Sequence, residues 1–113
     1  MKPKAPGLCT KCDAEVFEIL KRDPETRVPI SVGAAHDDAV RVSVLLKTGS
    51  IMDLTFCAEC AAALTPADLA EIWQRVMISW IAQSGAEHPF VKTQTDNAIL
   101  GVYRKQLWKD ISP

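Results

Sequence analysis

The stretch Cys9-Thr10-Lys11-Cys12, together with Cys57-Ala58-Glu59-Cys60, decides the predicted fold, and the two pairs contain every cysteine of the chain. Each CxxC pair places two sulfurs on the same side of a tight turn. Four thiolates complete the closed tetrahedral shell that a structural zinc ion prefers, and they leave no ligand position for water. We therefore predict one structural Zn²⁺ bound by Cys9, Cys12, Cys57 and Cys60. Two disulfides or a redox CxxC are the alternatives.

The totals of the chain indicate one small domain. The 113 residues include 13 basic and 14 acidic side chains, for a net charge of -1, so the overall field does not attract polyphosphate. The amino-terminal residues have no following apolar segment of a signal peptide, and no run approaches the ~20 apolar residues of a membrane span. We expect a cytoplasmic protein, in which reduced thiols are free to bind metal.

The region between the two cysteine pairs begins irregularly. Residues 1–7 carry two lysines and two prolines and predict a flexible arm. Residues 15–20 alternate acidic and β-favouring side chains and indicate a short strand. Residues 21–38 are rich in proline and turn residues, which predicts a long loop insertion with at most one edge strand near residues 30–32.

The clearest element is a β-hairpin. Residues 39–46 alternate Val40, Val42 and Val44 with polar side chains, and residues 51–56 alternate again. Residues 47–50 form the turn, where Gly49 can adopt a positive φ. The second strand leads directly into Cys57, after which an alanine-rich run favours a helical turn that places both thiolates on one face.

A long core helix should follow. Thr65, Pro66 and Asp68 are typical of an N-cap, a first-turn proline and a capping acid, and Gly85 should end the helix after about Gln83. The apolar positions of this helix cover about 180°, which is wider than the ~100° needed against one neighbour. They are Leu69, Ile72, Trp73, Val76, Met77, Trp80 and Ile81. The hairpin should cover one side, and the carboxy-terminal segment or a second copy the other.

The carboxy-terminal part, residues 84–113, is predicted to be a connector and a last helix packed on the same domain. Asp96 should cap that helix, which runs to about Asp110. Its apolar stripe consists of Ile99, Leu100, Tyr103, Leu107 and Ile111.

The order of elements in residues 8–83, with CxxC, a hairpin and a CxxC that leads into a helix, resembles the treble-clef and zinc-ribbon group of zinc fingers. The resemblance implies an α+β, zinc-organised fold with Cys9, Cys12, Cys57 and Cys60 as ligands. The group includes nucleic-acid binders, ribosomal proteins and protein-interaction modules, so the fold does not select a function. The separation of the pairs, 44 residues (13–56), departs from the ~12–20 of compact sites.

We expect no enzymatic activity. Treble-clef nucleases use a histidine pair on the hairpin and helix, whereas the two histidines here, His36 and His88, fall in predicted loops. His36, Asp37 and Asp38 suit a solvated turn better than a second metal site, and His88 before Pro89 suits a loop or capping position. No serine elbow, glycine-rich phosphate loop or HExxH motif is present in the sequence.

Two hypotheses for function use zinc as a scaffold. The first is a protein-interaction or regulatory module, with a partner protein or a second copy bound through Met77, Ile78, Ile81 and Trp108. Its alternative is that the connector folds back and covers Ile81 with Phe90 and Val91 within one chain. A small size suggests a bacterial or bacteriophage accessory protein, and no small-molecule substrate or membrane contact is expected.

The second hypothesis is a transcription- or replication-associated nucleic-acid binder. It requires scattered basic side chains to converge on one face, and we expect such binding to be weak. The candidate contacts are Lys2, Lys4, Lys11, Lys21, Arg22, Arg104, Lys105 and Lys109.

Overall fold

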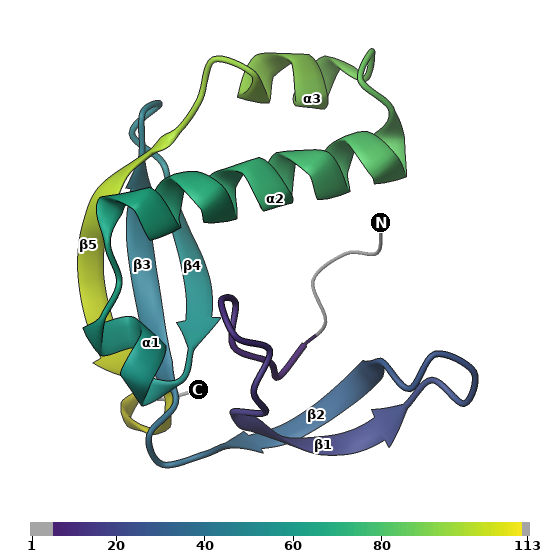
Figure 1. Cartoon of the computed structure of the whole chain (residues 1–113), viewed down its shortest axis with the longest axis vertical. Coiled ribbons are helices and arrows are strands. Elements are labelled where there is room, and N and C mark those ends of the chain that lie inside the picture. Colours follow the sequence, from purple (N-terminus) through teal and green to yellow (C-terminus); the bar gives the residue numbers. More distant parts are fainter. Residues whose placement is uncertain (1–5, 112–113) are drawn as a thin grey trace.

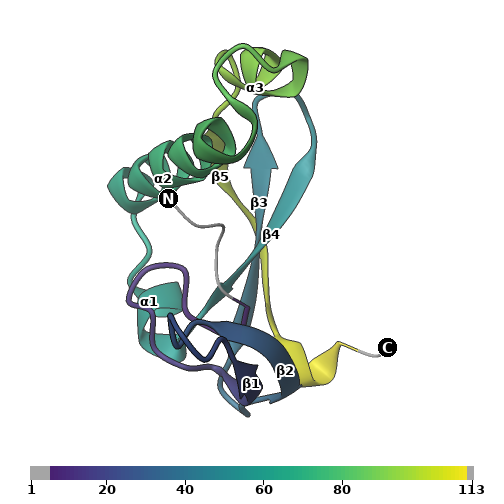
Figure 2. The same ribbon diagram turned by 90° about the vertical axis from the view of Figure 1, so that its right-hand side faces the viewer.

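The computed structural model describes residues 6–111, which form two antiparallel β-sheets and three helices (Figures 1 and 2). Lys2 and Lys4 therefore lie outside the described residues. In chain order the elements are β1 Phe17–Arg22, β2 Pro29–Ala35, β3 Val40–Leu46, β4 Ile51–Phe56, α1 Ala58–Ala62, α2 Pro66–Ser84, α3 Pro89–Gln94, β5 Ile99–Leu107 and the 3₁₀ turn η1 Trp108–Asp110.

The larger sheet has the strand order β4-β3-β5, with all neighbours antiparallel. The predicted hairpin is confirmed as β3 and β4, in which Val42 pairs with Leu54 and Gly49 has φ 93° in the turn. Because side chains alternate along a strand, the valines of β3 all lie on the same face of the sheet. That face is buried, since Val42 and Val44 have no exposed surface.

Helix α2 crosses the buried face of this sheet (Figure 1). Thr65 accepts a hydrogen bond from the Asp68 amide and the Asp68 carboxylate accepts one from the Thr65 amide, which is the predicted capping box. Gly85 ends the helix with φ 87°, also as predicted. The buried side chains of the helix and the sheet form a single core, which includes Val42, Val44, Leu54, Phe56, Leu69, Ile72 and Trp73.

The region predicted to be a loop, residues 21–38, contains a full strand. Strand β2 is seven residues long and pairs with β1, and Phe17 lies opposite Ala35. The sequence therefore predicted a shorter strand in this region than the structure contains. The β1–β2 pair lies below the larger sheet, as Figures 1 and 2 show, and Phe17 contacts Trp108 edge-on with ring centroids 5.7 Å apart.

The prediction of a carboxy-terminal helix from Asp96 to about Asp110 is wrong. Residues 99–107 form β5, which pairs with the second edge of β3, and the short helix α3 lies in the predicted connector. The open edge of β3 offers a row of backbone donors and acceptors that a docked helix would leave unpaired. A strand that contains Val102 and Tyr103 satisfies them, and both residue types favour extended structure.

Candidate metal centre

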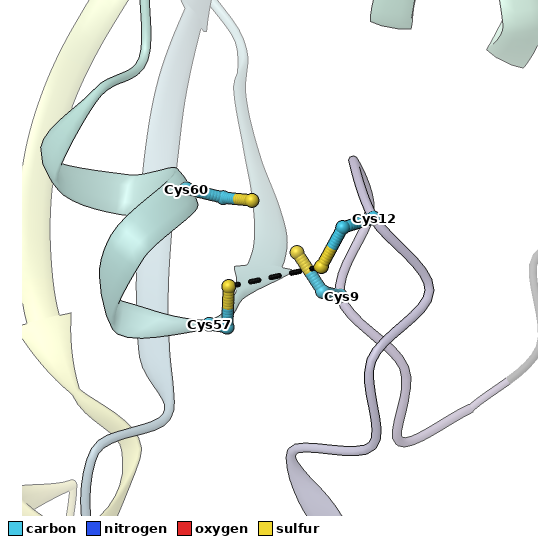
Figure 3. Close-up of side chains that lie close together, drawn as sticks. All are labelled: Cys9, Cys12, Cys57 and Cys60. Carbon is cyan, nitrogen blue, oxygen red and sulfur yellow. Dashed lines mark hydrogen bonds between the residues drawn. The ribbon is translucent and has the colours of Figure 1, made fainter.

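The first cysteine pair lies on a tight loop just before β1. An isolated bridge pairs Leu8 with Glu15, and the Cys9 amide donates to the carbonyl of Ala14 at 2.8 Å. The Asp13 amide donates back to the Cys9 carbonyl at 3.0 Å, and Asp13 itself has φ 63°. These bonds fold the loop so that the side chains of Cys9 and Cys12 point to the same side (Figure 3).

The second pair lies where β4 passes into α1. Cys57 is the N-cap residue of α1 with extended backbone, and its carbonyl accepts a hydrogen bond from the Ala61 amide at 3.0 Å. Cys60 is three residues further on, so both sulfurs project from the same side of this turn. The predicted helical turn after the second CxxC pair is thus confirmed.

The four sulfurs converge on one point between the two loops (Figure 3). All four ligand atoms lie within 4.8 Å of one another, and the Cys12 and Cys57 sulfurs are 3.8 Å apart. Sulfurs at ~2.3 Å from a tetrahedral ion are about 3.8 Å apart, whereas a disulfide requires ~2.05 Å. All four cysteines are free thiols, so the cluster is a site for one metal ion and not a pair of disulfides.

Four polar contacts connect the first loop to β4 and α2. Thr10 donates from both its amide and its hydroxyl to the carbonyl of Thr55 in β4, each at 2.8 Å. Arg75 of α2 donates to the Thr10 carbonyl at 2.8 Å, and the Lys11 ammonium lies 3.1 Å from the Asp68 carboxylate. The loop is therefore bonded to β4 and to the first half of α2.

Basic side chains surround the cluster. The Lys105 ammonium of β5 donates to the carbonyl of Ala61, next to Cys60, at 2.6 Å. The hydrogen bond with Asp68 raises the pKa of Lys11, and the negative field of Cys60 adds to it. A divalent ion with four thiolates carries two net negative charges, so nearby ammonium groups stabilise it.

The thiols differ in how easily they ionise. Burial disfavours the Cys9 thiolate, but the amides of Cys12, Cys57 and Lys11 outweigh it and lower the pKa of Cys9 to about 7. Burial and the neighbouring sulfurs of Cys57 and Cys12 raise the pKa of Cys60. Four thiolates repel one another at this distance, so a bound cation is what allows all of them to ionise together.

The two histidines have no part in the cluster. His88 caps α3, because its Nδ1 accepts a hydrogen bond from the Phe90 amide at 3.1 Å, which confirms the predicted capping role. His36, Asp37 and Asp38 are exposed in the turn before β3. Within residues 6–111 the cysteine cluster is the only group of metal-ligating side chains of this kind.

The residues predicted to bind a partner differ in accessibility. Ile78 and Ile81 are exposed on α2, with 48% and 40% of their surface accessible, whereas Met77 and Trp108 are half-buried against the core. The connector does fold back, because Val91 is buried and Phe90 lies edge-on to Trp80 with centroids 5.0 Å apart. It leaves Ile81 partly accessible.

The candidate nucleic-acid contacts are spread over several elements. Lys11 is paired with Asp68, Arg22 with Glu15, and Lys105 is bonded to the Ala61 carbonyl. The others that the structure describes are exposed on β1, β5 and η1; they are Lys21, Arg104 and Lys109.

Sequence reasoning missed the part that Arg75 and Lys105 play at the cluster. Arg75 is 65 positions from Thr10 and Lys105 is 44 positions from Ala61. No local pattern links residues so far apart, and the predicted carboxy-terminal helix offered Lys105 only as a candidate nucleic-acid contact. The only signal was their charge, which a solvated face carries equally well.

Comparisons with known proteins found no matching family model, no matching curated protein and no matching solved structure. Among the described helices, none is both long enough and apolar enough to cross a membrane. The class that the fold and site define is accordingly a small mixed α/β domain with a four-cysteine metal site.

Proposed function

We propose that this protein is a structural zinc protein whose folded surface binds another protein. The assignment of a structural zinc rests on the convergence of the four cysteines on a single point, with their ligand atoms within 4.8 Å of one another. Soft thiolate ligands in a tetrahedral arrangement select zinc or iron, and zinc is the usual ion of closed structural sites. Cys9, Cys12, Cys57 and Cys60 would hold it and leave no open position.

The proposed fold group is the treble clef. Its support is the order of local elements: a first knuckle, the β3–β4 hairpin, and a second knuckle at the beginning of α1. The β1–β2 pair accounts for the unusual separation between the two knuckles, because it is inserted between the first knuckle and the hairpin.

A closed metal site supports a scaffolding role and not catalysis. A metal acts on a substrate through an open coordination position, and four cysteine ligands leave none. We therefore propose a non-enzymatic function.

The second half of the proposal rests on apolar side chains that the fold leaves accessible. Ile78 and Ile81 lie three residues apart on α2, so they are neighbours on the helix surface, and both are exposed. Phe90 of α3 is also 48% accessible beside Trp80. Clustered exposed apolar side chains mark interaction sites more often than isolated ones do.

Trp108 has a different place in the proposal. Its ring packs against Phe17, and the Arg41 guanidinium lies 5.5 Å from its centroid. The remaining surface of the ring lines an open pocket of about 340 Å³ together with Leu8, Phe17 and Val32. We keep Trp108 as a proposed contact, but its replacement would also disturb the packing between the two sheets, so it is a poor test residue.

Nucleic-acid binding is the weaker candidate. Ion pairs or hydrogen bonds already engage Lys11, Arg22 and Lys105 within the chain. Affinity for duplex DNA depends on the number of phosphates neutralised, so the few remaining cations support only weak, salt-sensitive binding. Sub-micromolar sequence-specific binding at physiological salt would reverse this ranking.

The metal is tested by elemental analysis of protein purified under reducing conditions. We expect one zinc per chain, and a Cys12→Ser variant should retain less. An iron-containing product with visible absorption, or disulfide-paired thiols, would contradict the zinc assignment.

The interaction is tested by pull-down from nuclease-treated lysate with Ile78→Ser and Ile81→Ser variants that retain their metal. We expect both to lose a partner that the wild type captures. Leu20→Ser is the matched control, since Leu20 is an apolar residue on β1 that is even more exposed, with 59% of its surface accessible. Sedimentation of each variant separates a second copy from a different protein. Retention of every partner by both α2 variants would place the interface elsewhere.

A further inference from the structure

Strand β5 is a free edge of the larger sheet. It is nine residues long and pairs with β3 on one side only. Within residues 6–111, no strand other than β3 pairs with β5, and the contact with α1 is a side-chain one, from the Lys105 ammonium to the Ala61 carbonyl. An edge strand of this length presents a row of unpaired backbone donors and acceptors to any extended chain.

Two bulges expose apolar side chains on this strand. The register with β3 shifts between Ser43 and Val44 and again between Leu45 and Leu46. Each shift leaves one β5 residue without a partner on β3, and these two residues are Tyr103 and Leu100. They are 62% and 64% accessible, more than any other large apolar side chain of the described chain.

The strand and the η1 turn that follows it are locally basic in a chain of net charge -1. Residues 99–109 contain Arg104, Lys105 and Lys109 and no acidic residue. In the described part of the chain, neither Arg104 nor Lys109 forms an ion pair. The edge thus combines unpaired backbone groups, exposed apolar side chains and uncompensated positive charge.

We propose that the outer edge of β5 binds an extended, acidic segment of a partner protein as an additional β-strand. The inference rests on the proposed protein-binding function and adds a second site, apart from Ile78 and Ile81 of α2, with a stated partner chemistry. Backbone hydrogen bonds along the edge would supply affinity, and carboxylates would pair with Arg104 and Lys109. Apolar residues of the same segment would contact Leu100 and Tyr103.

The charge of the edge argues against a second copy as the occupant. Antiparallel pairing of β5 with itself, centred between Arg104 and Lys105, would place Arg104 of each copy directly opposite Lys105 of the other copy. Like charges at such short cross-strand distances are destabilising. Charged residues on edge strands commonly prevent self-pairing, and the same charges favour an acidic strand.

Nucleic acid is a less suitable occupant than a peptide. A phosphate backbone has no alternating amide donors and carbonyl acceptors to continue the sheet. Two cations on β5 and one on η1 would release few counterions, so binding to phosphate would disappear near physiological salt.

The test uses the zinc-loaded full chain and a synthetic acetylated peptide of about eight alternating glutamate and valine residues, a length that one strand can pair. Titration is followed by backbone amide NMR shifts and hydrogen exchange. We expect shifts and added protection confined to residues 99–107. Replacing glutamate by lysine in the peptide should abolish binding, and so should proline at alternate positions.

Arg104→Glu should weaken peptide binding about three- to tenfold, because it replaces a favourable cross-strand pair by a repulsive one. Lys21→Glu is the matched control, since it makes the same charge change on an exposed residue of β1 in the other sheet. Tyr103→Ser should also weaken binding without loss of metal.

Several results would overturn the inference. They are peptide shifts located on β4 or on the β1–β2 pair, equal binding of the lysine peptide, and an unchanged affinity of Arg104→Glu. Tighter binding of oligothymidine than of the acidic peptide at physiological salt would assign the edge to nucleic acid, and a β5-dependent dimer in sedimentation would assign it to a second copy. Ile78→Ser should bind the peptide as the wild type does. If Ile78→Ser loses its lysate partners but the wild type does not bind the peptide at β5, the protein-binding function stands and only the inference about β5 is refuted.

Discussion

Removal of the metal should release the first knuckle and the β1–β2 pair while leaving the larger sheet and α2 folded. The polar contacts that hold the first loop are the two Thr10 bonds to Thr55, the Arg75 bond to Thr10 and the Lys11–Asp68 ion pair. The three hydrogen bonds, at ~1 kcal/mol each, contribute about 3 kcal/mol, and the solvent-screened ion pair adds little to this sum.

Burial of Val16 adds about 2 kcal/mol, because its side chain is almost fully enclosed. Against this total of about 5 kcal/mol, fixing the backbone of residues 9–16, which are eight residues (16 − 9 + 1), costs on the order of 8–16 kcal/mol. A structural four-cysteine zinc contributes an apparent ~10–16 kcal/mol and reverses the balance. Without it, the loop should detach, whereas Val42, Leu54 and Ile72 of the larger sheet and α2 still pack against one another.

The assay is hydrogen exchange on the reduced, zinc-loaded chain before and after addition of a strong chelator. Amides in residues 9–22 and 29–35 should lose protection, and those in residues 40–56 and 66–84 should keep most of theirs. The control is the same chelator already saturated with zinc. Persistent protection of residues 9–16 in protein shown to be metal-free would refute the reasoning, and so would loss of α2 in the same step.

Four further predictions concern the supports of the site and of α2. Lys105→Met should lower zinc retention about threefold in competition with a chromophoric chelator. The substitution removes the ammonium group that donates to the Ala61 carbonyl near the carboxyl end of α1, next to Cys60. Thr65→Ala should lower the free energy of unfolding by ~1 kcal/mol in urea titrations through loss of the N-cap. The backbone bond to Thr65 and the ion pair with lysine depress the folded-state pKa of Asp68. The Asp68 carboxylate therefore adds to the free energy of unfolding above its unfolded pKa of ~4, and this addition should be lost as the pH falls through the folded pKa. Asp68→Asn should flatten that part of a curve of stability against pH. Gly85→Ala should lower the free energy of unfolding by ~1 kcal/mol in the same titrations, because φ is 87° at this position. Gly101→Ala is the control and should be close to neutral, because Gly101 has no positive φ. Neither added methyl group has an atom within 4 Å, so only the backbone conformation differs.

Local patterns in the sequence were enough for several elements. The β3–β4 hairpin follows from strict alternation around Gly49, and α2 follows from its capping box and Gly85, since these signals act over a few residues. The four cysteines were predicted to meet because two CxxC pairs supply the four thiolates of a closed tetrahedral zinc shell. The long separation of the two CxxC pairs did not prevent the four sulfurs from meeting, because part of the intervening chain forms its own β1–β2 pair.

Tertiary structure decided the carboxy-terminal third. The spacing of Ile99, Tyr103 and Leu107 fits one helix face, but the second edge of β3 lacked a partner, and strand pairing there satisfies backbone groups that a helix would not. That edge belongs to residues about 60 positions earlier in the chain, so no window around residues 99–107 contains it. The same pairing brings Lys105 to the metal centre and leaves the outer side of β5 open, and neither result follows from the order of residues alone.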